Sequence, residues 1–240
     1  MQDGLYVTLS GQMALEKRMN TIADNVANMS TVGFRATGVR FSDLVEGTGA
    51  SQVSFASTGE EYLSTQSGAL RQTGNPLDFA VRGEGWFAID TPAGMVLTRD
   101  GRFELNVEGG LQTLEGYPVL DAGGAPIQLD PNGGPPVAGA DGSLRQGERR
   151  VGALGLFAHA PGADFKRFGN SGIIPQNEPE PIVDRMDAGV RQGFVEDANV
   201  NPVTEMMRLI QVQRAFEAQA AATRETENSF DSAVKTLASK

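Results

Sequence analysis

Two long segments with helical periodicity stand at the two ends of the chain, and they constrain the fold more than any other feature. In the first segment, apolar residues recur at alternating spacings of four and three positions: Leu15, Met19, Ile22, Val26 and Met29. The second segment carries a similar series: Phe216, Ala220, Thr223, Phe230, Val234 and Leu237. This alternation is typical of a helix face that another helix covers, as in a coiled coil. We therefore expect two helices that pair with each other or with copies of themselves.

The first helix is predicted from about residue 4 to residue 29, a length of about 40 Å. Residues 30–33 combine hydroxyl groups, which compete with the helical backbone, with a glycine that tolerates positive φ, so the helix should end there. Asn25 and Asn28 share one face of the helix, where their amides could hydrogen-bond a neighbouring chain or the following turn. The alternative is two exposed asparagines near a fraying end.

The second helix has a clear start signal. Asn201 can cap the free amides, Pro202 suits the first helical position, and Glu205 stands where the helix dipole favours an anion. No Gly or Pro occurs from there to residue 237 beyond Pro202 itself. The segment therefore predicts roughly 50 Å of helix.

The middle of the chain changes from a linker pattern to a strand pattern. Residues 35–74 are rich in Gly, Ser and Thr with scattered hydrophobic residues, which predicts an extended linker. From residue 75, apolar and polar residues alternate, and turn signals such as Asp100-Gly101 separate short strands. We expect a mixed α and β, multi-domain fold. The helices of residues 1–34 and 197–240 would pack together as a coiled-coil-like axial domain, with a central antiparallel β domain over residues 75–196.

Composition excludes several functions. A formal net charge of −10 argues against a nucleic-acid partner and against binding to anionic membranes, because both require clustered Lys and Arg. The chain has no cysteine, so it offers no disulfide and no thiolate metal site. No stretch reaches the roughly 18 apolar residues of a membrane span, and residues 1–20 lack a signal-peptide pattern. We expect no membrane insertion.

No constellation of residues indicates catalysis. His159 is the single histidine, so a metal site there would need carboxylates as its other ligands, and a surface or structural role is the simpler interpretation. The glycine-containing tract at residues 82–85 precedes a strand rather than a helix and contains an acid, so it does not predict a phosphate-binding loop. We expect no catalytic residue, no metal, no cofactor and no small-molecule substrate.

Three stretches together resemble the axial proteins of the bacterial flagellum, the rod, hook and hook-associated family. They are residues 22–28 (IADNVAN) with the following 33–35 (GFR), residues 73–81 (TGNPLDFAV) with 85–87 (GWF) and 98–101 (TRDG), and residues 199–217, which begin NVNP. They occur in the expected order at both ends and in the middle. Trp86 stands where a Phe is usual, and Gln219 stands near a position where Asn is common.

The resemblance implies a structural subunit of the basal-body rod that assembles helically through its terminal helices to form the drive shaft for motility. The implied partners are copies of itself, other rod proteins and the flagellar export apparatus, which would export the chain to the periplasm-spanning rod without a cleaved signal peptide. The expected assembly interface of the first helix and its turn comprises Leu15, Met19, Ile22, Asn25, Val26, Asn28, Met29, Gly33 and Phe34. That of the second helix comprises Asn199, Asn201, Met206, Ile210, Gln213, Phe216, Ala220, Phe230, Val234 and Leu237.

Four alternatives remain at this stage. Length and the opening Gly4-Leu5-Tyr6 most resemble a proximal rod protein, but a distal rod or hook subunit belongs to the same family. The two helices could form a hairpin within a monomer. From other classes, the chain could be a secreted β-domain module that binds glycans, or a hydrolase that uses scattered carboxylates.

Overall fold

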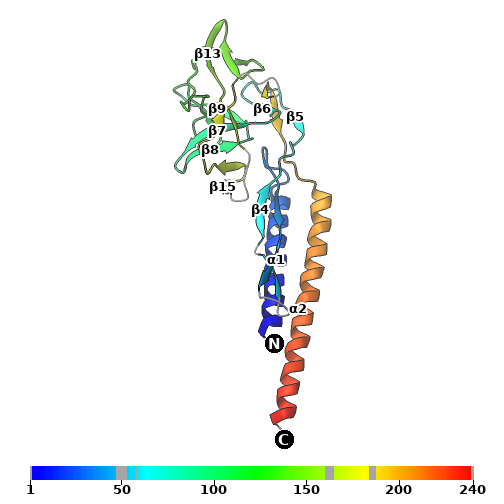
Figure 1. The fold of residues 1–240 in the computed structure, drawn as a ribbon. Helices are drawn as coiled ribbons and strands as arrows, with labels where there is room; N and C mark the ends of the chain where they lie inside the picture. The colour runs from blue at the N-terminus through cyan, green and yellow to red at the C-terminus, as the bar shows by residue number, and fades with distance from the viewer. Residues whose placement is uncertain (1, 47–52, 58, 160–164, 184–187, 239–240) are drawn as a thin grey trace. The chain divides into compact units, whose positions relative to one another are not determined.

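The computed structural model describes residues 2–46, 53–57, 59–159, 165–183 and 188–238, and it divides the chain into two compact units. Unit 1 comprises residues 1–27, 37–62 and 201–240, and unit 2 comprises residues 28–36 and 63–200. Helices occupy both ends of the chain and antiparallel strands occupy the middle (Figure 1). The predicted mixture of helices and a central antiparallel β region is therefore confirmed.

Unit 1 is built around two helices that pack against each other with opposite chain directions (Figure 1). They are α1 (Gln2–Ala27) and α2 (Pro202–Ala238). Strands accompany them: β1 (Thr37–Arg40), β2 (Asp43–Glu46), β3 (Val53–Ala56) and β4 (Glu60–Leu63). β2 pairs with β3 in antiparallel fashion, β1 pairs with β4, and both β1 and β3 lie against α1. The segment expected to be a linker thus contains strands, some of them packed on the first helix.

The ends of the helices follow local hydrogen bonds. α1 ends at Ala27, two residues before the expected end, because Asn28 begins a turn in which its backbone oxygen accepts from the Thr31 N–H at 3.0 Å. Met29 therefore lies outside the helix, with 39% of its surface exposed. At the start of α2, the Asn201 Oδ1 accepts from the Thr204 N–H at 3.1 Å, which confirms the predicted cap.

Unit 2 is centred on an antiparallel sheet with the strand order β15-β16-β8-β7-β14-β17. These strands are β7 (Trp86–Thr91), β8 (Gly94–Thr98), β14 (Leu156–Ala158), β15 (Lys166–Phe168), β16 (Gly172–Ile174) and β17 (Glu180–Pro181). β7 and β8 form a hairpin whose register pairs Ile89 with Val96. Gly94 has a φ of +91°, a conformation that glycine supplies at no steric cost to the turn.

Shorter pairings surround this sheet. β11 (Val137–Ala138), β12 (Ser143–Gln146) and β13 (Arg149–Ala153) form a three-stranded sheet, and β9 (Phe103–Leu105) pairs with β10 (Leu111–Thr113). β6 (Phe79–Arg82) pairs with β18 (Gly189–Gln192), and β5 (Leu70–Gln72) pairs with β19 (Phe194–Glu196). Residues 154 and 155 separate β13 from β14. The Cα of Gly155 faces the Asp121 backbone, where a Cβ would come within 2.5 Å.

The main core of unit 2 lies between these sheets. Phe79, Phe87 and Phe103 form its aromatic centre, with Phe87 and Phe103 in an edge-to-face contact at a centroid distance of 5.4 Å. Phe87 has no exposed surface. Of the buried apolar residues in the described chain, all except Ile22 and Val212 belong to unit 2. Neither described helix is both long enough and apolar enough to cross a membrane.

The aromatic core gives a direct test of the fold. We expect Phe87→Ala to reduce the free energy of unfolding by about 3–5 kcal/mol, because it removes a fully buried ring and leaves a cavity. Val107→Ala is the matched control, since Val107 is 96% exposed and its truncation should change the free energy by less than about 0.5 kcal/mol. Chemical denaturation of both variants measures the difference. Equal stabilities would show that Phe87 is not in the core.

Candidate functional site

His159, the one candidate for acid–base chemistry, lies in a small hollow of unit 2. The hollow has a volume of about 220 Å³ and also contains Trp86, Arg99 and Ile182 in its wall. Burial lowers the pKa of His159 below its usual value. Among the described residues, no group of three or more His, Asp or Glu side chains could hold a metal ion. The polar arrangements of the described residues are contacts between chain segments.

The inner faces of α1 and α2 form the first of these contacts. Ile22 and Val212 are buried, and Leu15, Met19 and Val26 on α1 are half-buried, as are Leu209, Phe216 and Ala220 on α2. Gln219 donates from Nε2 to the Thr8 carbonyl at 3.5 Å. Gly11 faces the same glutamine, and a Cβ there would come within 3.3 Å of the Gln219 amide. A side chain at this position would require the end of the Gln219 side chain to shift by a few tenths of an ångström.

The outer faces of the same helices carry exposed apolar side chains. On α2, the exposed fractions are 67% for Val203, 50% for Met206, 55% for Met207 and 49% for Ile210. These positions follow the i, i+3, i+4, i+7 pattern of one helix face. On α1, Leu9 and Met13 are 49% and 53% exposed. We call the set Val203, Met206, Met207 and Ile210 the outer stripe of α2.

A buried carboxylate in unit 2 joins segments from both ends of the chain. Glu196 on β19 forms ion pairs with Arg35 Nη2 at 2.7 Å and with Arg99 Nη1 at 3.0 Å. It also accepts from the Gly68 N–H at 2.8 Å. The side chains of Arg35, Arg99 and Glu196 are 2%, 5% and 1% exposed. We call these three residues the Glu196 clamp.

The clamp holds two positive charges and one negative charge, and both guanidinium groups also donate hydrogen bonds to backbone carbonyls. Burial lowers the pKa of Arg35 to about 10 and also lowers that of Arg99, while the charge of Glu196 acts in the opposite direction on both. Arg35 additionally donates to the carbonyls of Thr65 and Gln66, and Arg99 donates to the Gly83 carbonyl at 3.0 Å. Each guanidinium thus satisfies part of its donor capacity after leaving water, although the Nε atoms of Arg35 and Arg99 are buried without a hydrogen-bond partner.

Trp86 packs beside both arginines of the clamp. The Cζ atoms of Arg35 and Arg99 lie 5.8 and 5.3 Å from the centroid of its ring, a distance at which the π face attracts a cation. This gives a physical role to the one tryptophan of the chain. A larger aromatic face at this position covers two guanidinium groups rather than one.

The turn after α1 is fixed to the strand before α2 by backbone hydrogen bonds within unit 2. The Gly33 N–H donates to the Glu196 carbonyl at 2.7 Å, and the Asn199 N–H donates to the Phe34 carbonyl at 3.3 Å. Gly33 has a φ of +71°, and a Cβ there would approach the Asp100 nitrogen to 2.2 Å, so only glycine fits. Phe34 is buried at 2% exposure.

Two of the predicted interface asparagines use their amides within the chain. Asn25 is 3% exposed, and its amide both donates to the Thr37 carbonyl and accepts from the Thr37 N–H, each at 2.9 Å. Asn199 accepts from the Ala36 N–H at 2.6 Å and donates to the Gln66 carbonyl at 2.8 Å. Of the two roles that the sequence left open for Asn25, the structure therefore shows the contact with the segment that follows the helix.

The remaining predicted residues fall into three groups. Met206, Ile210 and Gln213 lie on the exposed side of α2, and Asn201 is exposed at its cap. Asn28 accepts from the Thr31 hydroxyl at 3.1 Å in the turn. Phe230, Val234 and Leu237 lie on α2, but their side chains are outside the described part of the structure.

The sequence-based reasoning did not assign the Glu196 clamp. Arg35 and Arg99 stand in two of the quoted family stretches, and Glu196 ends a strand pattern, yet nothing in the sequence linked the three. No local pattern could have found it, because Glu196 directly follows Val195 on a strand, where successive side chains point to opposite faces, and such spacing predicts an exposed charge.

Known families match three parts of the chain. Residues 5–35 match the family described as flagella basal body rod protein. Residues 80–145 match the D1 domain of flagellar hook protein FlgE/F/G, and residues 191–236 match the C-terminal part of flagellar basal body rod FlgEFG proteins. These are, in order, the first helix with its turn, the β region and the second helix.

Individual relatives extend the match to the whole length. The chain is 65% identical over 240 residues to the flagellar basal-body rod protein FlgF of Mesorhizobium japonicum, with 100% of both chains covered. It is 54% identical to FlgF of Rhizobium meliloti, over 99% of this chain and 98% of the relative. It is 30% identical to the rod protein FlgG of Bacillus subtilis, over 92% of this chain and 93% of the relative.

The matched family consists of structural proteins of the flagellar rod, not of enzymes. The chain belongs to the flagellar basal-body rod protein family, and it is a structural subunit of that rod. The resemblance drawn from the sequence is confirmed.

The Glu196 clamp can be tested against a neighbouring ion pair on the surface. We expect Glu196→Gln to lower the free energy of unfolding by about 3–5 kcal/mol, because it leaves two buried guanidinium groups without a countercharge. Asp197→Asn should cost at most about 1 kcal/mol, because its partner Arg71 is 54% exposed and Asp197 is 40% exposed. Urea unfolding of both variants makes the comparison, and equal losses would refute the clamp.

Proposed function

We propose that this rod subunit is a proximal rod protein and that its α1–α2 pair is the element through which copies and other rod proteins stack. The axial element would comprise residues 1–34 and 197–240, and residues 75–196 would form a β domain that makes lateral contacts. The stacked subunits would form a shaft that spans the periplasm and transmits torque. The chain would reach it through the flagellar export apparatus, without a cleaved signal peptide.

The outer stripe of α2 is the observation that carries this proposal. Its four residues are about half exposed or more, although the inner face of the same helix already packs on α1. A contiguous apolar stripe on a helix that already has a partner is typical of a surface that a further protein covers. Helical stacking provides that cover, since a head-to-tail contact that does not close continues as an open filament.

The similarity to FlgF supports the proximal position over the distal rod or the hook. Identity falls from 65% with one FlgF to 30% with one FlgG.

Quantitative mass spectrometry of isolated hook–basal bodies tests the position directly. A handful of copies per particle is the expected result, and several-fold more copies would favour the distal rod. A secreted β-domain binding module predicts instead that residues 75–195 alone retain function.

One substitution separates assembly from folding. We expect Ile210→Asp to abolish motility and to remove the chain from isolated basal bodies while leaving its thermal unfolding nearly unchanged, because Ile210 is exposed in the single chain. Ile22→Asp should instead destabilise the chain itself by several kcal/mol, since Ile22 is 5% exposed.

Ala215→Asp is the control for Ile210→Asp. Ala215 is also exposed, but it stands about 140° from Ile210 around the helix. Soft-agar motility and the amount of the chain in purified basal bodies are measured for all three variants. Normal motility with Ile210→Asp, or an equal defect with Ala215→Asp, would contradict the outer stripe as an assembly surface.

A further inference from the structure

Three arginines gather on the hairpin formed by β12 and β13 in unit 2. The register places Arg145 directly opposite Arg150, and Arg149 opposite Gln146. All three arginines are exposed, and no carboxylate of the described chain lies within ion-pair distance of their guanidinium groups. Like charges directly opposite on neighbouring strands are destabilising. Glu148 at the turn and Asp141, whose charge interacts with Arg150, offset part of this charge, so three arginines against two carboxylates leave the hairpin cationic.

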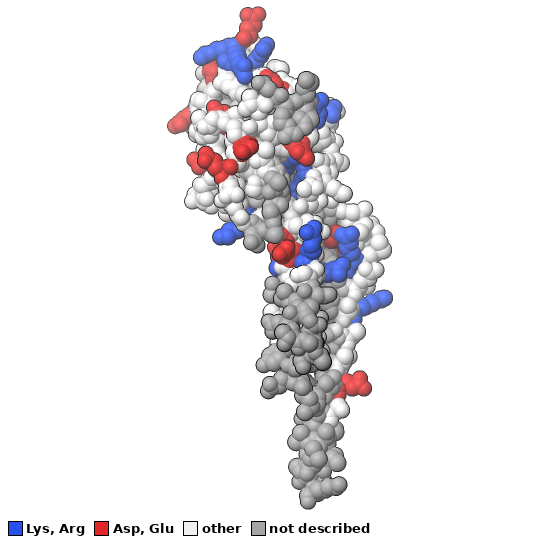
Figure 2. Space-filling model, in the orientation of Figure 1, with Lys and Arg blue, Asp and Glu red and all other residues white. Residues whose placement is uncertain are grey.

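This cationic tip contrasts with the rest of the chain. The chain carries a formal net charge of −10, with 20 basic and 30 acidic residues. In Figure 2, blue side chains gather at the end of unit 2 that β13 forms, and red side chains predominate over the rest of the visible face of that unit. The tip therefore fits an anionic surface, and unit 2 of a second copy supplies one.

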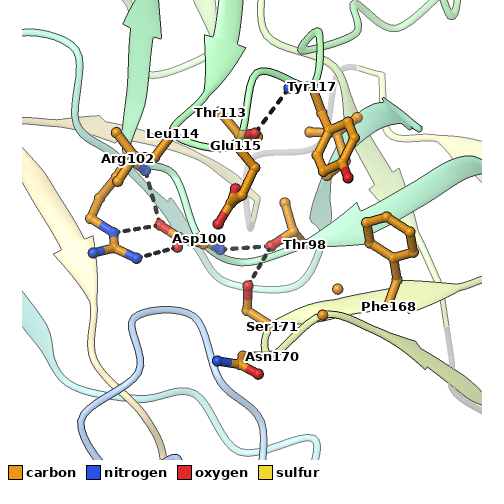
Figure 3. A pocket seen from close by; sticks show the side chains of 13 residues that line it. Thr98, Asp100, Arg102, Thr113, Leu114, Glu115, Tyr117, Phe168, Asn170 and Ser171 are labelled. Carbon is orange, nitrogen blue, oxygen red and sulfur yellow. Dashed lines mark hydrogen bonds and ion pairs between the residues drawn. The ribbon is translucent and has the colours of Figure 1, made fainter. Parts of the chain in front are cut away.

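A pocket at the other end of unit 2 has the chemistry to receive a guanidinium group (Figure 3). Its volume is about 340 Å³, and Tyr117 and Phe168 stand in its wall with their rings edge to face at 5.5 Å. The carboxylates of Asp100 and Glu115 lie on the same wall. Aromatic faces and carboxylates are together the preferred surroundings of an arginine side chain.

The pocket wall has two carboxylates and one guanidinium group. The Asp100 carboxylate accepts two hydrogen bonds from Arg102 in a bidentate contact, one from Nη2 at 2.6 Å and one from Nε at 2.9 Å. Glu115 is exposed and forms no ion pair with any residue that the structure describes. The pocket wall thus carries one net negative charge, and Glu115 acts on Arg102 through its charge without forming an ion pair.

We propose that this pocket receives Arg149 from the β12–β13 hairpin of a second copy of the chain, with Glu115 as its countercharge and Tyr117 and Phe168 as its aromatic wall. The proposal rests on the proposed function, because it places this contact between neighbouring subunits. Within unit 2, β13 and β15 lie at opposite ends, so a hairpin does not reach the pocket of its own copy (Figure 1). Repetition of the contact gives an open, head-to-tail array.

The absence of native cysteine allows a disulfide test in the full-length chain. Glu148→Cys marks the hairpin tip of one preparation, and Leu114→Cys, at a residue 54% exposed on the pocket rim, marks a second preparation. The two are mixed at high concentration and low salt and then oxidised. We expect a disulfide-linked heterodimer on a non-reducing gel. Val107→Cys, which is 96% exposed and not in the pocket wall, replaces Leu114→Cys as the control.

Charge reversal then identifies the pair. Adding Arg149→Glu to the hairpin preparation, or Glu115→Arg to the pocket preparation, should lower the yield of heterodimer about tenfold, and combining the two should restore most of it. Each of four results would overturn the proposal. They are an equal yield of heterodimer with Val107→Cys, a yield unchanged by Arg149→Glu, disulfides only between two hairpin cysteines, and no disulfide at all.

The outcome is separable from that of the proposed function. Introducing Ile210→Asp into both preparations should leave the heterodimer yield unchanged, because Ile210 belongs to the helix pair of unit 1. Loss of the chain from basal bodies in that variant, with the disulfide intact, supports both conclusions. Presence of the chain in basal bodies with no disulfide overturns only the hairpin contact.

Discussion

The buried Glu196 carboxylate is the interaction on which unit 2 depends. It is held between two guanidinium groups, at 2.7 and 3.0 Å, with less than a tenth of any of the three side chains exposed. Arg35 follows the turn after α1, Arg99 ends a hairpin of the central sheet, and Glu196 ends the last strand before α2. A single carboxylate therefore holds together three segments that are far apart in the sequence. Desolvation opposes such a cluster, so its value lies in fixing which segments meet rather than in its net contribution to stability.

The two units differ in how they are stabilised. Unit 2 contains nearly all the buried apolar residues of the described chain, including the three phenylalanines of its centre. On α2, by contrast, Glu205 and Val212 are the buried residues among the side chains that the structure describes, although the helix has 37 residues. A helix gains most of its stability from the packing of its apolar face. The helix pair is consequently the part of the chain that gains most from a neighbour, and this links its composition to assembly.

The sequence predicts those features that depend on local or periodic patterns. The Asn201 cap, the glycine at position 33 and the two terminal helices all follow from rules that act over a few residues, and the structure contains each of them. Features that depend on distant pairings could not be read in the same way. The Glu196 clamp requires residues 35, 99 and 196 to come together. The Asn25 amide requires the backbone of Thr37, which lies on β1, a strand within the segment predicted to be a linker. The glycine at position 155, between β13 and β14, is required by the Asp121 backbone, a neighbour 34 positions away.

The two proposed contacts between subunits would differ in their physical character, and the difference matters for a rotating shaft. The outer stripe of α2 is apolar, so its contact would be nondirectional, would grow with the area buried and would be insensitive to salt. The contact of Arg149 with the pocket is directional and charged, so it would add little affinity but would favour one register between neighbouring copies. An apolar seam alone permits sliding along and around the helices. A charged contact in addition to that seam would make such slips costly, because each slip would leave Glu115 and Arg149 without partners.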